Sequence, residues 1–149
     1  MKIGILSDTH GRLPSRVLDL FDDVDLIFHA GDIGSLEVIE ALESLAPVHA
    51  VSGNMDGGTI SRRFPRKDMI EAGKMCFYLV HEPYNIDIDP VAASVNCVIF
   101  GHTHQVTIEE KGSVLFLNPG SVCLPRRGPA TVIKCLLSGN RLKPEIMTL

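Results

Sequence analysis

The sequence predicts a single α/β domain, and three features of the chain lead to this prediction. In the first half, short aliphatic runs alternate with amphipathic stretches of helical spacing, as in parallel sheets joined by helical crossovers. The 149 residues suit one domain with a sizeable core. Aromatic residues make up only 5% of the chain, so the core should be mainly aliphatic, as in buried sheets. We therefore expect one domain over residues 1–149.

The opening half contains three aliphatic runs and two stretches with helical spacing. After Ser15, the residues Val17, Leu18 and Phe21 fall on one helix face. After Ser35, a candidate N-cap, the residues Leu36, Ile39 and Leu42 also share one helix face. The expected elements are a strand at 2–6, a helix from Pro14–Ser15, a strand at 24–28, a helix from Ser35 and a strand at 48–51.

The rest of the chain is less regular at first and then becomes strand-rich. A charged stretch with a proline should form a loop or a sheet edge, and a short helix is expected before the fifth strand. Gly-containing turns at Lys111-Gly112 and Gly139-Asn140 predict antiparallel hairpins. The expected elements are a loop or edge at 62–67, a strand at 75–80, a short helix at 90–95, and strands at 97–100, 106–109, 114–117, 130–136 and 143–147.

Composition excludes several classes of protein. The formal net charge is −4 and the basic residues are scattered, which argues against a broad nucleic-acid surface. No pair of the four cysteines has the spacing of a zinc or redox motif, and Cys76 and Cys97 lie in or beside aliphatic runs, so we expect these two to be buried thiols and the compartment to be reducing. No apolar run approaches membrane-spanning length, and Asp8 comes too early for a signal peptide. We therefore expect a cytoplasmic protein without membrane association.

Five predicted strands are followed by side chains that can bind a metal ion. In open α/β sheets, sites form just beyond the carboxyl ends of the strands, so these side chains can converge. Seven oxygen and nitrogen donors without a thiolate are too many for one tetrahedral ion but suit two ions that share a carboxylate. Manganese, iron, zinc or nickel would be compatible ions. The seven residues are Asp8, His10, Asp32, Asn54, His81, His102 and His104.

The ordered set of motifs resembles the calcineurin-like metallophosphoesterases, whose pattern is D-x-H, G-D, G-N, H and G-H-x-H. Here the motifs stand as Asp8-Thr9-His10, Gly31-Asp32, Gly53-Asn54, His81 and Gly101-His102-Thr103-His104. The small size, and Asn118-Pro119-Gly120-Ser121-Val122 followed by Pro125-Arg126, look like the small prokaryotic phosphodiesterase branch. This resemblance implies a four-layer α-β-β-α sandwich, metallo-dependent phosphatase-like, in which two mixed sheets are flanked by helices.

The resemblance also implies roles for the seven residues. Asp8, His10 and His104 would bind the first metal, Asn54, His81 and His102 the second, and Asp32 would bridge them. A metal-bridging hydroxide would attack the phosphorus of a small phosphate ester in line with the leaving oxygen. Manganese is the preferred ion. The predicted catalytic residues are Asp32, Asn54 and His102, and the predicted substrate contacts are Asn54 and Arg12.

Three departures from the larger phosphatases shape the expected reaction. Met55 stands where those enzymes have a His that helps protonate the leaving group, so esters with good leaving groups, and phosphodiesters in particular, should be preferred. His81-Glu82-Pro83 lacks the second His of an H-G-H motif, and residues 84–95 are short for the helix expected there. A phosphomonoesterase is the alternative activity, and a non-catalytic scaffold that resembles the retromer subunit is the alternative of a different class. A homodimer is compatible with the resemblance.

Several other polar residues are expected to be structural. His29 could at most support Asp32, and His49 lies within a predicted strand. Asp56 should shape the glycine-rich turn, and Asn118 and Ser121 should hold the turn behind the site.

Overall fold

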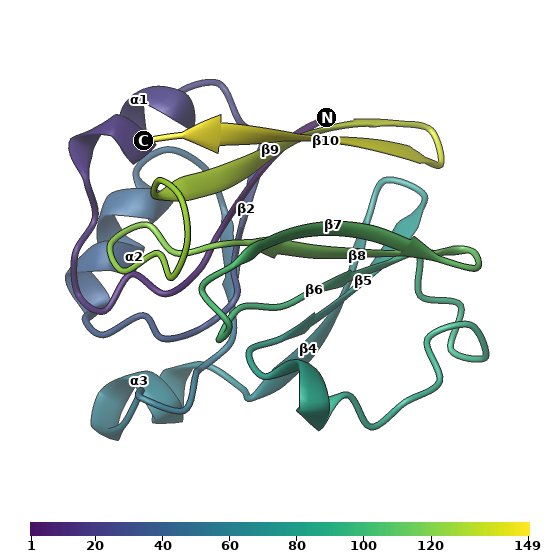
Figure 1. Cartoon of the computed structure of the whole chain (residues 1–149), viewed down its shortest axis with the longest axis horizontal. Helices are drawn as coiled ribbons and strands as arrows, with labels where there is room; N and C mark the ends of the chain where they lie inside the picture. Colours follow the sequence, from purple (N-terminus) through teal and green to yellow (C-terminus); the bar gives the residue numbers. More distant parts are fainter.

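The computed structural model describes all residues, 1–149, and contains two five-stranded sheets that pack face to face (Figure 1). Sheet A has the order β10-β9-β1-β2-β3 and sheet B the order β4-β5-β6-β8-β7. Sheet A consists of β1 (Lys2–Leu6), β2 (Leu26–His29), β3 (Val48–Ala50), β9 (Thr131–Ser138) and β10 (Arg141–Thr148). Sheet B consists of β4 (Lys67–Ala72), β5 (Met75–Val80), β6 (Cys97–Ile99), β7 (Val106–Lys111) and β8 (Val114–Pro119).

Both sheets are mixed: sheet B has antiparallel hairpins at both edges, whereas sheet A has one at the β10 edge and parallel strands up to the β3 edge. β1, β2 and β3 are parallel, and so are β5, β6 and β8. The predicted hairpins form as β7–β8 and β9–β10. The last third is not wholly antiparallel, however, because β8 returns to pair in parallel with β6. The reason is that β7 turns back at the sheet edge, so that β8 can occupy the place beside β6.

The apolar residues divide into three clusters that define the layers. Seventeen buried residues, among them Ile5, Phe28 and Phe77, fill the space between the two sheets. A second cluster of 15 buried residues packs the outer face of sheet A against α1 (Ser15–Leu20), α2 (Leu36–Glu43) and α3 (Gly58–Arg63). The helices therefore cover sheet A, as the alternating pattern of the first half predicts. None of them is long and apolar enough to cross a membrane.

The outer face of sheet B has a thinner cover. Six buried residues, including Tyr78 and Phe100, lie there, and Ile86 and Ile88 of the irregular chain after η1 (Pro83–Asn85) pack against them. The short helix predicted at 90–95 is wrong, since this segment is a turn. Its first amides, Val91 and Ala92, donate to the Asp89 side chain, and Ser94 has φ +58°, which ends the turn. The fourth layer is thus one 3₁₀ turn and loop.

The stretch at 62–67, predicted as a loop or a sheet edge, agrees with that prediction in part, because residues 64–66 form a loop that leads into an edge strand. It begins in α3, a helix that the sequence did not indicate, and it ends where β4 starts. β4 is an edge strand of sheet B, in which the exposed Met69 and Glu71 alternate with the buried Ile70 and Ala72, while Lys67 and Asp68 are half-buried. Edge strands tolerate such charges because one side of the ladder stays unpaired.

Candidate metal centre

All seven predicted ligands converge where the carboxyl ends of β1, β2 and β3 meet those of β5 and β6 from the other sheet. His104 Nε2 lies 3.1 Å from Asp8 Oδ1, and His81 Nε2 lies 3.3 Å from Asp32 Oδ2. His10 Nε2 is 3.9 Å from both carboxylates. Asn54 Oδ1 is 3.1 Å from His81 Nε2 and 3.1 Å from His102 Nδ1. The five strand ends therefore form one site, although they come from two sheets.

The backbone at this site is held in an unusual conformation. Six non-glycine residues of the chain have positive φ, and five of them are predicted ligands. Such residues cost about 1–3 kcal/mol each and persist only where the surrounding structure enforces them. The five ligands and their φ angles are Asp8 (+56°), His10 (+46°), Asp32 (+52°), His102 (+66°) and His104 (+55°).

The two ligand pairs on single loops share one design. Asp8 and His10 flank Thr9, and His102 and His104 flank Thr103. Thr9 Oγ1 donates to Ile33 O at 2.8 Å, and Thr103 Oγ1 accepts from the side-chain amide of Asn118 at 2.9 Å. In each loop the middle threonine is tied to the scaffold, so both flanking side chains are free to face the site.

Two glycines of the motifs are required by close contacts. A Cβ on Gly53 would lie 2.1 Å from Asp32 Oδ1. A Cβ on Gly101 would lie 2.0 Å from Ser7 Oγ and 2.8 Å from Asp8 Oδ2. The loops that carry Asn54 and His102 can approach the carboxylates only because these positions lack a side chain.

The inner part of the site, which we call the floor, consists of Asp8, Asp32 and His81. Their exposed fractions are 0%, 3% and 0%. Burial raises the pKa of Asp8, and its Oδ1 has no hydrogen-bond partner. Burial alone would also raise the pKa of Asp32, but the neighbouring His81 and the hydrogen bond from the Met55 amide lower it overall. Two carboxylates so placed leave one buried oxygen uncompensated, which is costly without a cation.

The outer part, which we call the rim, consists of His10, Asn54, His102 and His104. Asn54 is exposed and the three histidines are half-buried. The rings of His10 and His104 lie 5.4 Å apart, and those of His81 and His102 meet edge to face at 5.3 Å. His10 Nε2 is buried and, like Asp8 Oδ1, has no hydrogen-bond partner.

Two imidazoles are oriented by backbone carbonyls. His81 Nδ1 lies 2.7 Å from Ala30 O, and His104 Nδ1 lies 2.6 Å from Leu124 O. A carbonyl only accepts, so Nδ1 carries the proton in both rings and the Nε2 lone pair points into the site. Neutral imidazoles with a fixed tautomer are suited to bind a metal ion.

Residues behind the site fix the loops, and their roles extend the predictions. Asp56 accepts from the amides of Ile33, Gly34 and Gly53 and so joins the Asp32 loop to the Asn54 loop. Ser121 and Cys123 both donate to the Asp8 carbonyl. The Asn118 side chain donates to Gly101 O, and its oxygen accepts from Gly120. The prediction that Asp56, Asn118 and Ser121 shape turns is confirmed.

The two remaining histidines are structural. His29 is buried, Nδ1 accepts from the Gly31 amide, and Nε2 lies 2.9 Å from Thr9 Oγ1, to which it must therefore donate. Burial lowers the pKa of His29 to about 3, so the ring is neutral. It supports the Asp8–His10 loop through Thr9. His49 is half-buried on β3 and packs against Phe28 with the ring centroids 6.0 Å apart.

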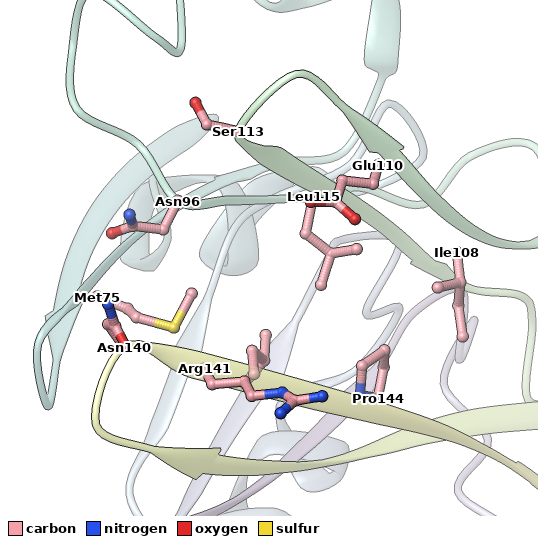
Figure 2. A pocket seen from close by; sticks show the side chains of 10 residues that line it. Met75, Asn96, Ile108, Glu110, Ser113, Leu115, Asn140, Arg141 and Pro144 are labelled. Carbon is pink, nitrogen blue, oxygen red and sulfur yellow. The ribbon is translucent and has the colours of Figure 1, made fainter.

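Two cavities of the structure can be located relative to the metal centre. A cavity of about 210 Å³ is lined by His10, Arg12, Cys123 and Leu124, so the predicted substrate contact Arg12 is beside the rim. Another cavity, of about 410 Å³, contains none of the seven ligands. Figure 2 shows it between the β7–β8 and β9–β10 hairpins, with Ile108 and Arg141 on facing strands.

The donor set fits divalent metal ions. Two groups have ligand atoms that all lie within 4.8 Å of one another, Asp8–His10–His104 and Asp8–Asp32–His81. Asn54 Oδ1 and His102 Nδ1 extend the second group on its open side. The two orphaned buried atoms, Asp8 Oδ1 and His10 Nε2, are both in the first group, where a cation would satisfy them.

Sequence reasoning missed two features of the site. One is the Leu124 carbonyl, which orients His104 through a contact that no side-chain pattern encodes. The other is Tyr84, whose ring meets His102 with the centroids 5.6 Å apart. The only hint in the sequence is that Tyr84 follows the predicted ligand His81 by three residues.

Comparisons with known proteins agree with this geometry. A profile of the calcineurin-like phosphoesterase superfamily domain matches residues 1–138. A probable metallophosphoesterase of Methanothermobacter thermautotrophicus is 35% identical, and the match covers 99% of this chain and 92% of that protein. The phosphodiesterase MJ0936 of Methanocaldococcus jannaschii is 35% identical over 83% of this chain and 85% of its own. The solved structure of an archaeal phosphodiesterase superposes with a TM-score of 0.83 at 29% identity, covering 99% of this chain and 100% of that one.

Proposed function

The chain belongs to the calcineurin-like phosphoesterase superfamily and is a metal-dependent phosphoester hydrolase, and we propose that it hydrolyses phosphodiesters with two divalent ions at the floor and rim. The observation that carries the proposal is the pair of orphaned buried atoms, Asp8 Oδ1 and His10 Nε2, inside a cluster of seven oxygen and nitrogen donors. A purely structural cluster would satisfy these atoms with hydrogen bonds.

We assign the ligands to two sites that share Asp32. Asp8, His10 and His104 would hold the first ion, and Asn54, His81 and His102 the second. The short Asn54–His81 and Asn54–His102 distances support the second group, and the 3.1 Å contact between His104 and Asp8 supports the first. Asp32 can bridge because Oδ1 is already held by the Met55 amide while Oδ2 faces the imidazoles.

The chain's own residues position the substrate and hold the protons. When bound, two divalent ions activate water for attack on phosphorus and neutralise charge on the phosphoryl group. Asn54 directs its oxygen toward His81 and His102, which leaves its amide nitrogen to donate to a phosphoryl oxygen. Arg12 would bind another oxygen from the cavity beside His10. We propose catalytic roles for Asn54 on this ground, and for Asp32 and His102 because they would hold the ions on which the reaction depends.

The preference for diesters with good leaving groups rests on Met55. Its side chain is 71% exposed and has no proton to give, although it follows Asn54 directly. A missing general acid typically lowers the rate by about 10²–10⁴-fold for a poor leaving group. The name of the relative MJ0936 supports a diester substrate.

We further propose manganese as the native ion, with iron, zinc and nickel as alternatives, because the donors are imidazole, carboxylate and amide. All four cysteines are free, which supports the prediction of a reducing, cytoplasmic compartment. A homodimer also stays a prediction.

The test uses purified protein with added manganese and an aryl phosphodiester. We expect hydrolysis by the wild type and none by Asp32→Ala, with a manganese content lower in the variant by elemental analysis. Comparison of kcat/KM on a diester and a monoester of the same phenol decides between phosphodiesterase and phosphomonoesterase. A protein that binds no transition metal and hydrolyses neither ester would favour the non-catalytic scaffold.

A further inference from the structure

One aromatic side chain at the metal centre, that of Tyr84, does not contribute to the apolar core. Tyr84 lies on η1 and is 70% exposed, and its ring belongs to none of the three apolar clusters. The ring meets the His102 ring edge on, with centroids 5.6 Å apart and an interplanar angle of 84°. An exposed tyrosine in contact with a candidate metal ligand therefore presents most of its surface to solvent at the rim.

Two contacts orient the Tyr84 ring despite its exposure. Its hydroxyl donates to Glu82 Oε1 at 3.4 Å, and Glu82 is itself buried, with an exposed fraction of 9%. The other carboxylate oxygen of Glu82 accepts from the Asn85 side chain at 2.9 Å. Held at the hydroxyl by Glu82 and at the ring by His102, the aromatic face loses little further freedom when a ligand packs on it.

Two other loops that carry the ligands also expose apolar side chains. Met55, directly after Asn54, is 71% exposed, and Leu124, whose carbonyl orients His104, is 55% exposed. Both belong to the ten large apolar residues of the chain that are exposed, as does Tyr84. A polar centre surrounded by such side chains suits a ligand with an anionic head and an apolar body.

We propose that Tyr84 determines specificity by stacking an aromatic group of the substrate, such as an aryl ring or a nucleobase, while the phosphoryl group lies at the metal centre. This inference rests on the proposed phosphoesterase function and adds the class of substrate. Stacked aromatic pairs are favoured beyond the area that they bury. Bases stack on exposed protein rings in a way that tolerates many sequences, because every base has a π face.

Ligand pairs that differ only in the aromatic group test this directly. Phenylphosphonate and methylphosphonate carry the same head group and cannot be hydrolysed at their P–C bond. We expect the manganese-loaded wild type to bind phenylphosphonate roughly threefold to tenfold tighter by titration calorimetry. Adenosine 5′-monophosphate against ribose 5-phosphate is the second pair, and the larger of the two ratios tells whether a base or an aryl ring is the better occupant.

Three variants separate the ring from its surroundings. Tyr84→Leu keeps apolar bulk, and we expect both ratios to fall to about one, with the affinity for methylphosphonate and the manganese content unchanged. Tyr84→Phe keeps the ring and should keep the preference. Val91→Ala removes an exposed apolar side chain farther along the same connection and is the matched control.

The outcomes distinguish the two levels of the proposal. Equal binding of both phosphonates by the wild type would overturn the stacking role and leave the phosphoesterase function intact. A loss of affinity for both phosphonates in Tyr84→Phe would also overturn it, because the hydroxyl and not the ring would be the contact. If the protein bound neither phosphonate and also hydrolysed neither the aryl diester nor the monoester, the proposed function and the stacking role would both be wrong.

Discussion

The floor and the rim of the metal centre are built in opposite ways. The floor places two carboxylates and an imidazole almost out of contact with solvent, and the rim leaves an amide exposed and three imidazoles half-exposed. Floor residues are surrounded by backbone and by side chains whose only evident task is to hold them, such as Ser121 and Asp56. The rim instead borders Arg12, Met55 and Tyr84, side chains that no core requires.

This difference indicates that the floor lowers the stability of the metal-free protein and that the rim determines which ligand binds. Burial of Asp8 and Asp32 side by side costs free energy that a bound cation would recover. The rim costs less because water still reaches it, so its residues can be adapted to an ion or a substrate. We therefore expect substitutions in the floor to affect stability and activity in opposite directions, and substitutions in the rim to affect mainly binding.

The largest effect should come from Asp8→Asn in the floor. An amide at this position cannot supply a negative oxygen to the first ion, and activity on an aryl diester should fall by at least about 10³-fold. The metal-free variant should nevertheless be more stable than the wild type by about 1–3 kcal/mol, because a buried charge without a partner is removed. Urea denaturation in a chelating buffer measures this difference.

The matched rim variant shows whether the contrast is real. His10→Asn also removes an orphaned buried atom, but from a half-exposed side chain, so we expect a change in metal-free stability below about 0.5 kcal/mol. A metal-free Asp8→Asn protein that is less stable than the wild type would show that the floor is not under electrostatic strain.

Within the rim, His102→Ala and His104→Ala should empty different sites. His102 Nδ1 faces Asn54, and His104 Nε2 faces Asp8, so each variant should keep about one of two ions and lose about 10²-fold in activity. Elemental analysis gives the content. Manganese electron paramagnetic resonance then shows which environment remains, and the two variants should give different spectra. Identical spectra and contents would contradict the split assignment.

Much of the floor and rim could be predicted because ligand types follow strand ends in the sequence. Asp8 and His10 come after a buried aliphatic run, and in parallel strands such positions share an edge. The strands at 2–6 and 75–80 agree with β1 and β5 residue for residue, since uninterrupted aliphatic runs have few other places to go. What the pattern could not show is that β5 and β6 lie in a second sheet, because sheet membership depends on contacts distant in sequence.

The parts that were not predicted depend on backbone and edge geometry. The loop or edge predicted at 62–67 reaches only the first residue of β4, and the rest of the strand was not assigned because charges such as Asp68 and Glu71 interrupt its apolar pattern. The helix expected at 90–95 does not form because Ser94 adopts a positive φ, which cannot be predicted from the residue type. The Ala30 and Leu124 carbonyls that orient His81 and His104 have no side-chain signature at all. Positions of ligands are thus more predictable than the contacts that orient them.

A smaller effect is expected from Asp56→Asn, which acts on the floor and the rim together. The carboxylate accepts three backbone amides, and a carboxamide has only one oxygen to accept them. We expect a loss of about 2–3 kcal/mol in stability and a fall of roughly 10–100-fold in metal affinity. Asp22→Asn, an exposed carboxylate after α1, is the control and should change neither. Unchanged metal affinity in Asp56→Asn would mean that the two loops are positioned without this clamp.

The smallest effect concerns His29, which supports the floor from behind. Its pKa is about 3 in the folded protein because the ring is buried, and about 6.5 in an unfolded chain. Below pH 6.5 the unfolded chain therefore binds a proton that the folded chain refuses, and this group lowers the free energy of unfolding as the pH falls toward 3. The slope is at most about 1.4 kcal/mol per pH unit.

His29→Gln keeps a donor for Thr9 and cannot be protonated, so metal-free urea titrations at pH 7.5, 6 and 5 should show its stability falling less steeply than that of the wild type. Parallel curves would mean that His29 is protonated in the folded protein. The ring could then not accept the Gly31 amide while donating to Thr9, and the assigned tautomer would be wrong.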